Sequence, residues 1–200
     1  MSRELVFTRF ERFWHWSQAV LIVALMTTGF EVNGSYALFG YAEAVEYHRI
    51  LAWLLIGLWV FAIFWHFTTG EWRQYLPTTE KLVAVVKYYT LGIYHPAVQH
   101  PFKKSRLSKH NPLQRLAYLF LKLCINPLIW ITGLLYMFYN DWSVVGLEGL
   151  SLGVVAALHL IGAFMMLFFF IAHVYMIFTA KPLTHYLKSM LTGYEEIEKE

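Results

Sequence analysis

The stretch that decides the fold runs from Gly153 to Thr179 and reads GVVAALHLIGAFMMLFFFIAHVYMIFT. About 20 apolar residues suffice for a helix to cross a bilayer, so this stretch predicts a membrane span. Its two histidines, His159 and His173, are fourteen residues apart. At about 3.6 residues per turn and 1.5 Å per residue, they lie on nearly one helix face, about 21 Å apart along the axis. An ionisable side chain inside a membrane is costly, so a functional role is the default hypothesis for both.

The composition of the whole chain agrees with a membrane protein. Its 200 residues are 58% hydrophobic and 14% charged, which is too apolar for an ordinary soluble domain. The length fits one compact unit, so residues 1–200 are predicted to form a single domain. Cys124 is the only cysteine, which excludes an intramolecular disulfide and disfavours a cysteine-ligated zinc or iron–sulfur site.

Hydropathy predicts three further spans, which makes the chain an all-α membrane protein. The four predicted spans cover residues 13–30, 48–68, 113–139 and 153–179. Pro127 is expected to kink the third span, because proline has no backbone N–H to donate. Between the second and third spans, residues 78–90 predict a short amphipathic helix on the membrane surface.

Charged residues outside the spans predict the orientation. The segment after span one contains three glutamates and, at the start of span two, Arg49. The segment between spans three and four contains Asp141 and Glu148 and no lysine or arginine. Basic residues mark the cytoplasmic side, so both termini and the long middle segment are predicted to be cytoplasmic. The basic residues on that side are Arg3, Arg9, Arg12, Arg73, Lys81, Lys87, Lys103, Lys104, Arg106, Lys109, Arg115, Lys181, Lys188 and Lys199.

Four histidines in or at the ends of the spans form two pairs of matching depth. His48 begins span two at the outer surface, at a depth like that of His159. His15 begins span one at the inner surface, at a depth like that of His173. Two neutral imidazoles on one iron give a six-coordinate haem suited to electron transfer. The pattern therefore predicts two stacked haems, with these four histidines as axial ligands.

The alternative is that the histidines lie at the membrane interface and reach water at helix ends. For His15, His48 or His66 taken singly that alternative is favoured, but two matched pairs that share one helix favour haem. His66 lies eighteen residues after His48, on the same face and about 27 Å deeper. It either replaces His15 as a ligand or serves a site beside the inner haem, and we prefer the second assignment.

Two arginines and several glycines lie near these histidines. Arg49 beside His48 and Arg12 just before His15 are each placed to pair with a haem propionate. Small residues allow a macrocycle or another helix to approach closely, and Gly162, one turn after His159, is the best candidate to make room for a haem. The other glycines in the spans that can do so are Gly29, Gly57 and Gly133.

With these residues the chain resembles the di-haem cytochrome b subunits of bacterial respiratory oxidoreductases, in the bacterial cytochrome b561 superfamily. The group includes the gamma subunit of formate dehydrogenase and the cytochrome b of nickel–iron hydrogenase, and the chain is most similar to the thiosulfate-reductase cytochrome b branch. The resemblance extends over nearly the whole chain. The segments that carry it are Arg12-Phe13-Trp14-His15-Trp16, Tyr47-His48-Arg49, Lys109-His110-Asn111-Pro112-Leu113-Gln114-Arg115, Pro127 with Thr132-Gly133, and the pair His159 and His173.

The resemblance implies a four-helix bundle with two haems b in the bacterial inner membrane, one haem for each histidine pair. It also implies that menaquinone or ubiquinone is oxidised or reduced near the inner haem. Asn111 and Gln114 would then hydrogen-bond a quinone carbonyl. His66 and His110 would do the same or relay protons. For Asn111, capping of a helix that starts at Pro112 is a role of equal weight.

Under this resemblance the chain is an electron-transfer, quinone-reactive subunit of an oxidoreductase complex. Its partner is a periplasmic iron–sulfur protein or multihaem cytochrome c. The alternative is a stand-alone b561-type quinone oxidoreductase acting on a small molecule such as superoxide, although the acidic outer loops disfavour an anionic substrate. A haem-free scaffold or transporter is the third hypothesis. The basic middle segment binds anionic lipid headgroups or, as we favour, simply marks the cytoplasmic side, and no nucleic-acid partner is expected.

Overall fold

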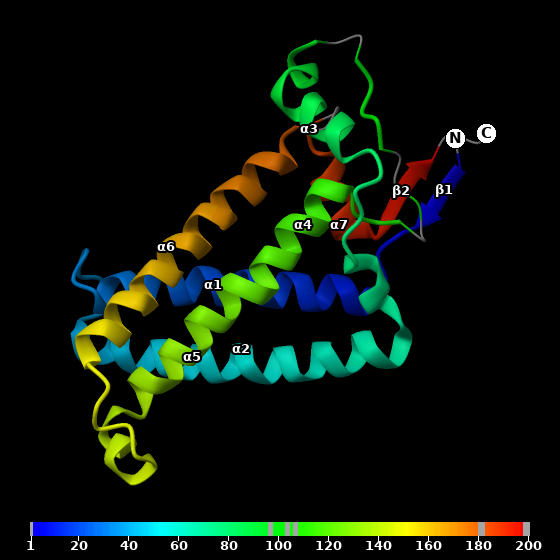
Figure 1. The fold of residues 1–200 in the computed structure, drawn as a ribbon. Helices are drawn as coiled ribbons and strands as arrows, with labels where there is room; N and C mark the ends of the chain where they lie inside the picture. The colour runs from blue at the N-terminus through cyan, green and yellow to red at the C-terminus, as the bar shows by residue number, and fades with distance from the viewer. Residues whose placement is uncertain (1, 96–97, 103–104, 106–107, 180–182, 198–200) are drawn as a thin grey trace. The chain divides into compact units, whose positions relative to one another are not determined.

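A computed structural model of the chain describes residues 2–95, 98–102, 105, 108–179 and 183–197 (Figure 1). Lys103, Lys104, Arg106, Lys181 and Lys199 of the predicted basic side lie outside the described residues. The α-helices are α1 (Arg9–Val32), α2 (Tyr41–Thr69), α3 (Leu82–Thr90), α4 (Pro112–Phe120), α5 (Asn126–Met137), α6 (Leu152–Ile177) and α7 (His185–Thr192). The strands are β1 (Ser2–Leu5) and β2 (Tyr194–Ile197), and short 3-10 helices cover Glu71–Tyr75, Gly92–Tyr94 and Tyr139–Val145.

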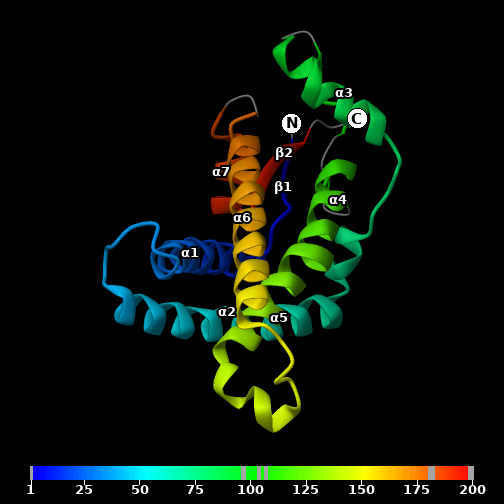
Figure 2. The ribbon, with the colours of Figure 1, turned by 60° about the vertical axis from the view of Figure 1, so that its left-hand side comes forward.

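Three of the predicted spans coincide with helices that are long and apolar enough to cross a membrane. These helices are α2, the helical stretch Pro112–Met137 and α6, and α6 runs without a break (Figure 2). The first predicted span lies within α1, which has 24 residues. It is not among these three helices, because His15, Ser17 and Gln18 lower the hydropathy of its first turns. The described chain is thus mainly helical with three candidate spans, and the bundle of four spans stays a prediction.

Pro127 interrupts the third predicted span as expected. α4 ends at Phe120, a π-helical turn covers Leu121–Ile125, and α5 begins at Asn126 with the proline in its first turn. Proline has no N–H for the carbonyl four residues earlier, and its ring clashes with that carbonyl in a regular α-helix. In the wider π turn the N–H of Asn126 donates to the carbonyl of Leu121, so the proline is accommodated without ending the helical stretch.

The structure departs from the all-helical prediction at the two ends of the chain. β1 and β2 pair as an antiparallel two-stranded sheet, with Ser2 opposite Ile197 and Leu5 opposite Tyr194 (Figure 1). Glu195 in β2 is buried, and its carboxylate accepts a hydrogen bond from the hydroxyl of Ser189 at 3.0 Å. Strands this short are not stable alone. The sheet therefore depends on two segments from opposite ends of the chain, which no local pattern predicts.

The short helix of the middle segment starts later than predicted. α3 covers Leu82–Thr90 rather than residues 78–90, and Lys81 before it has a left-handed backbone with φ of 58°. Val85 is buried, whereas Val83 and Val86 are exposed. Exposed apolar side chains on a short helix suit a position at the membrane surface. They agree with the predicted interfacial role of this helix, which stays a proposal.

The chain forms two compact units, each assembled from segments that are far apart in the sequence. The first unit comprises Met1–Trp16, Val60–Leu119 and Ala172–Glu200. The second comprises Ser17–Trp59 and Phe120–Ile171. In both units the long helices leave large apolar side chains exposed, which suits helices that face lipid. Examples are Phe61, Phe64 and Phe67 in the first unit, and Ile161, Phe164 and Phe168 in the second.

Candidate functional site

The second unit brings together two of the predicted histidine ligands. His48 in α2 and His159 in α6 have ring centroids 6.3 Å apart, with their ring planes at 83°. A threonine hydroxyl lies at the Nδ1 atom of each ring, because Thr28 Oγ1 is 3.0 Å from His48 and Thr132 Oγ1 is 3.0 Å from His159. Each Nδ1 is thus used within the protein, and Nε2 is the nitrogen left for a ligand.

The first unit brings together the other predicted pair. His15 in α1 and His173 in α6 have ring centroids 6.1 Å apart, with their ring planes at 47°. Nδ1 of His15 is buried and has no hydrogen-bond partner among the described residues, and the same holds for Nε1 of Trp14 and Nε of Arg12. Buried polar atoms rarely lack a partner in a folded protein. Three such atoms within four consecutive residues of α1 are therefore available to a bound polar or charged group.

Glycines border the histidine rings of the second unit. A Cβ atom on Gly29 would lie 3.0 Å from Cε1 of His48, and one on Gly133 would lie 3.1 Å from Cε1 of His159. Gly162, the glycine that the sequence favours for making room for a haem, has a different neighbour. A Cβ atom there would lie 2.7 Å from the side chain of Ile129, so Gly162 instead lets α6 approach α5.

His66 lies in a buried aromatic cluster of the first unit. Its Nδ1 is 2.6 Å from the carbonyl of Ala62 in the preceding turn of α2, to which it donates. Tyr75 lies between His66 and His110, with ring centroids 5.5 and 5.2 Å from theirs. Tyr118 is 5.0 Å from His110. The structure therefore links the two histidines predicted for quinone chemistry through Tyr75, a residue that no motif in the sequence indicates.

The hydroxyl of Tyr75 is held in its protonated form. Burial, and then the nearby Tyr118, Glu11 and Glu71, raise the pKa of Tyr75 far above its ordinary value. A group that keeps its proton across the physiological pH range can donate a hydrogen bond at all times. Tyr75 is therefore a permanent donor inside this cluster.

Asn111 and Gln114 form a capping box at the start of α4. The backbone N–H of Gln114 donates to Oδ1 of Asn111 at 2.8 Å, and the backbone N–H of Asn111 donates to Oε1 of Gln114 at 3.0 Å. The capping role predicted for Asn111 is thus confirmed. Nδ2 of Asn111 also donates to the hydroxyl of Tyr89 at 3.3 Å. A quinone carbonyl only accepts hydrogen bonds, so the amide N–H groups of these two side chains are the groups that can serve it.

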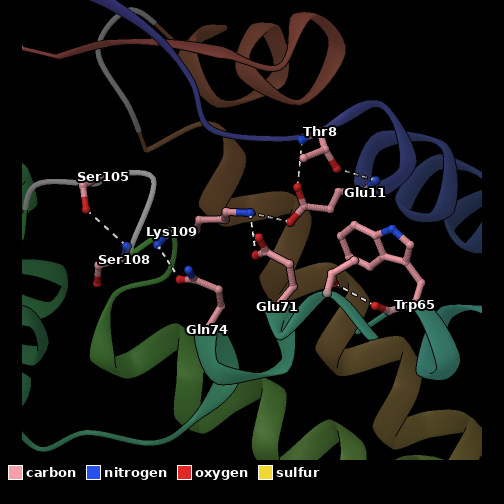
Figure 3. A network of polar contacts seen from close by, with 9 residues as sticks. Thr8, Glu11, Trp65, Glu71, Gln74, Ser105, Ser108 and Lys109 are labelled. Atoms are coloured by element: carbon pink, nitrogen blue, oxygen red, sulfur yellow. Dashed lines mark hydrogen bonds and ion pairs between the residues drawn. The ribbon is translucent and has the colours of Figure 1, made fainter. Parts of the chain in front are cut away.

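Lys109 is the largest fully buried side chain in the described part of the chain (Figure 3). Its Nζ is 2.7 Å from Oε1 of Glu11 and 2.8 Å from Oε2 of Glu71. Glu11 is fixed in turn, because its Oε2 accepts the backbone N–H of Thr8 at 2.7 Å. The backbone N–H of Lys109 donates to Oε1 of Gln74 at 3.2 Å.

The Lys109 cluster joins three segments of the first unit. Glu11 belongs to the first turn of α1, which leads to His15, and Glu71 begins the 3-10 helix that ends in Tyr75. Lys109 directly precedes His110. The sequence places Lys109 among the basic residues of the predicted cytoplasmic side and in a segment that carries the family resemblance. Its pairing with two glutamates from distant segments has no local signal. The cluster therefore joins the segments that carry His15 and the aromatic cluster of His66, Tyr75 and His110.

Glu31, one of the acidic residues of the predicted outer side, is buried and organises the connection between α1 and α2. Its Oε1 accepts the backbone N–H groups of Leu38, Phe39 and Gly40 at 2.7, 2.7 and 2.8 Å. Burial alone would raise the pKa of Glu31, but these three donors outweigh it and lower the pKa below its ordinary value. The carboxylate therefore acts as a fixed acceptor that closes the loop before the helix of His48.

Comparison with known proteins decides the family. The sequence model of the family described as "Prokaryotic cytochrome b561" matches residues 6–193. This chain belongs to the prokaryotic cytochrome b561 family. It is similar to "Putative cytochrome YdhU" of Escherichia coli (strain K12), with 28% identity over 197 residues that cover 94% of this chain and 73% of that protein. No solved structure gives a significant match. The resemblance inferred from the sequence is confirmed at the level of the family, which implies a membrane cytochrome with haem b.

The spacing within each histidine pair of this b561 cytochrome fits two imidazoles that would bind one haem iron. A bond from a metal ion to an imidazole nitrogen is about 2 Å long, so two imidazoles that bound the same iron would have ring centres up to about 6 Å apart. The observed distances of 6.1 and 6.3 Å agree with that spacing. Within the described residues there is no group of three or more His, Cys, Asp or Glu side chains that could hold a metal ion.

The two arginines predicted for the haem propionates of this cytochrome differ in their surroundings. Nη1 of Arg12 donates to the carbonyl of Leu191 at 2.5 Å, while its Nε is buried without a partner among the described residues. Arg49 is half exposed and pairs with Glu46 at 2.8 Å. Arg12 therefore keeps a buried donor for a carboxylate, whereas Arg49 has a carboxylate partner already.

Proposed function

We propose that this protein is a di-haem cytochrome b that passes electrons between a periplasmic redox partner and the membrane quinone pool. The observation that supports the proposal best is the presence of two histidine pairs, with ring centroids 6.1 and 6.3 Å apart. Both pairs take one histidine from α6. The family implies haem b, and two pairs with the spacing of axial ligands suit two haems.

In this proposal His48 and His159 hold the outer haem. His15 and His173 hold the inner haem. Each haem supplies a one-electron redox couple, and bis-histidine ligation suits electron transfer rather than oxygen binding. The protein's own contribution is to fix the four imidazoles and to surround them with apolar helices.

The quinone site is proposed for the cluster of the first unit around Tyr75. Quinone reduction takes up protons as well as electrons, and the buried His66 and the half-buried His110 on either side of Tyr75 are groups that can carry them. The amide N–H groups of Asn111 and Gln114 are the proposed donors to a quinone carbonyl. Menaquinone and ubiquinone both present such carbonyls, so this chemistry suits either of them.

We also propose that the chain lies in the bacterial inner membrane with α1 as a fourth span and both termini in the cytoplasm. The concentration of basic residues on one side of the predicted spans supports this orientation. In a Cys124→Ser background, a cysteine at Ser35 should react with an impermeant thiol reagent from outside whole cells, and a cysteine at Thr79 should not. The reverse labelling would invert the topology.

The proposed partner is an iron–sulfur protein or a multihaem cytochrome c at the outer face. The predicted outer segments carry acidic residues, with Arg49 as their one basic side chain. Complementary charge speeds and orients the encounter of two proteins. A partner with a basic docking surface is therefore the expected match, and co-purification from native membranes would identify it.

Haem stoichiometry of the purified protein tests the proposal. A pyridine haemochrome assay should give two haems b per chain in the wild type and one in His159→Ala and in His173→Ala. His95→Ala is the matched control, because His95 is exposed in a loop outside both pairs, and it should keep two haems. Wild-type protein with a single haem, or either α6 variant with two, would contradict the assignment.

A separate variant tests the quinone site. His66→Ala should keep both haems, because neither proposed pair includes His66, but should slow the oxidation of the haems by a quinone analogue. Loss of a haem in this variant would instead make His66 an axial ligand and remove that role from His15.

A further inference from the structure

The two histidines of the second unit are held by the same device. Thr28 in α1 lies 3.0 Å from Nδ1 of His48, and Thr132 in α5 lies 3.0 Å from Nδ1 of His159. Both threonines are buried, at 3% and 4% exposure. Each contact joins one helix to the next helix along the chain, α1 to α2 and α5 to α6.

The direction of both hydrogen bonds follows from the position of the threonine proton. Thr28 Oγ1 is 2.9 Å from the carbonyl of Ala24, and Thr132 Oγ1 is 2.5 Å from the carbonyl of Leu128. A carbonyl cannot donate, so each hydroxyl gives its single proton to the carbonyl of its own helix. The hydroxyl oxygen is then an acceptor toward the imidazole. Nδ1 of each histidine must therefore be the protonated nitrogen, and Nε2 holds the lone pair that a metal ion needs.

The residue after each threonine is a glycine that faces the same ring. A Cβ atom on Gly29 would be 3.0 Å from Cε1 of His48, and a Cβ atom on Gly133 would be 3.1 Å from Cε1 of His159. Both distances are shorter than ordinary van der Waals contact. The Thr-Gly step therefore combines an acceptor that fixes the tautomer with the space that lets the ring lie against the helix backbone.

In the first unit, His15 has no such threonine contact at its Nδ1 among the described residues. Nδ1 of His15 is buried without a hydrogen-bond partner among the described residues. The neighbouring ring is Trp16, at 5.2 Å between centroids, and its indole N–H donates to the carbonyl of Met190 at 3.3 Å. A donor-only indole cannot accept the N–H of a histidine. His15 therefore lacks the threonine acceptor that lies at Nδ1 of His48 and of His159.

We propose that Thr28 and Thr132 are positioning residues that set the tautomer of His48 and His159 and lower the reduction potential of the haem that these histidines hold. The proposal rests on the di-haem function proposed above. An acceptor at Nδ1–H makes the ligating nitrogen more basic, which stabilises ferric over ferrous iron. Removal of the hydroxyl should therefore raise the midpoint potential of the outer haem and leave that of the inner haem unchanged.

Redox titration of the purified di-haem protein tests this inference. Thr28→Val and Thr132→Val remove the hydroxyl at nearly constant volume, and each should shift one of the two midpoint potentials upward, with a larger shift in the double variant. Thr27→Val is the matched control, because Thr27 bonds the carbonyl of Val23 in the same way at 2.9 Å but contacts neither histidine. Thr28→Ser and Thr132→Ser keep the hydroxyl, so each should have the wild-type midpoint potentials.

Spectra of the ferric protein separate this role from simple packing support. The electron paramagnetic resonance g values of one low-spin haem should move in the valine variants and return in the serine variants. If the valine variants keep two haems with unchanged potentials, the inference is wrong. If a valine variant loses one haem, the serine variant at the same position distinguishes the two roles. A serine variant with two haems at wild-type potentials supports the hydroxyl role. A serine variant that also loses a haem contradicts it. Wild-type protein with fewer than two haems would instead overturn the proposed function before any threonine is changed.

Discussion

Replacement of Lys109 by methionine should destabilise the protein by about 3–5 kcal/mol, the usual cost of removing one partner of a buried ion pair. The side chain of Lys109 is 2% exposed, and those of Glu11 and Glu71 are 10% and 27% exposed. Methionine keeps the apolar stem of lysine, so the change removes the charge and leaves the packing nearly intact. Glu11 and Glu71 would then be two carboxylates close together without a cation.

Thermal unfolding in detergent, followed by tryptophan fluorescence, measures this effect. For a chain of this length each 1 kcal/mol changes Tm by about 2–4 °C, so Lys109→Met should lower Tm by roughly 6–20 °C. Glu71→Gln is the matched control, because it removes a partly hydrated charge and keeps the pair between Lys109 and Glu11. It should lower Tm by a smaller amount. The double variant Lys109→Met with Glu11→Gln should recover part of the loss, because one uncompensated buried charge is gone.

A Tm decrease for Lys109→Met below about 2 °C would refute this reasoning, since it would correspond to no more than about 1 kcal/mol. So would a decrease no larger than that of Glu71→Gln. Either result would mean that water or another cation neutralises the two glutamates, and that the cluster does not hold the start of α1 to the segment of Tyr75.

Three further predictions concern local features. Asn111→Ala should cost about 1 kcal/mol of stability through loss of the cap of α4, measured as Tm, with Gln114→Ala showing a similar loss if the box acts as a unit. Gly162→Ala should destabilise by about 1–3 kcal/mol, because its new methyl group would lie 2.7 Å from Ile129; Gly57→Ala, with nothing within 4 Å, is the control and should be neutral or slightly stabilising. Glu31→Gln should lower Tm at neutral pH. Because the pKa of folded Glu31 lies below its usual value of 4.5, its contribution is complete above about pH 4.5 and is lost as the pH falls through the folded value. The Tm difference from wild type should therefore shrink in acid, and a difference that is constant with pH would contradict the role of the three N–H donors.

The parts of the fold that were predictable are those with a local cause. The three most apolar helices follow from hydropathy within a single segment, and Pro127 predicts its own interruption because the missing N–H belongs to that residue. The cap at Asn111 is likewise contained in four consecutive residues. Depth matching along the helices pairs His48 with His159 and His15 with His173, and the structure brings both pairs together, while their haem role stays a proposal.

The sequence by itself determined which long apolar segments are helical, the spacing of the two histidines on α6 and the family to which the chain belongs. Each of these depends on residues that are neighbours along the chain or on a pattern carried by the chain itself. Only the tertiary structure decided that Lys109 is buried between two glutamates, that the chain ends form a sheet, and that threonines contact His48 and His159. These are contacts between distant segments. Their energy depends on burial and on distances of about 3 Å between donor and acceptor, which no single segment specifies.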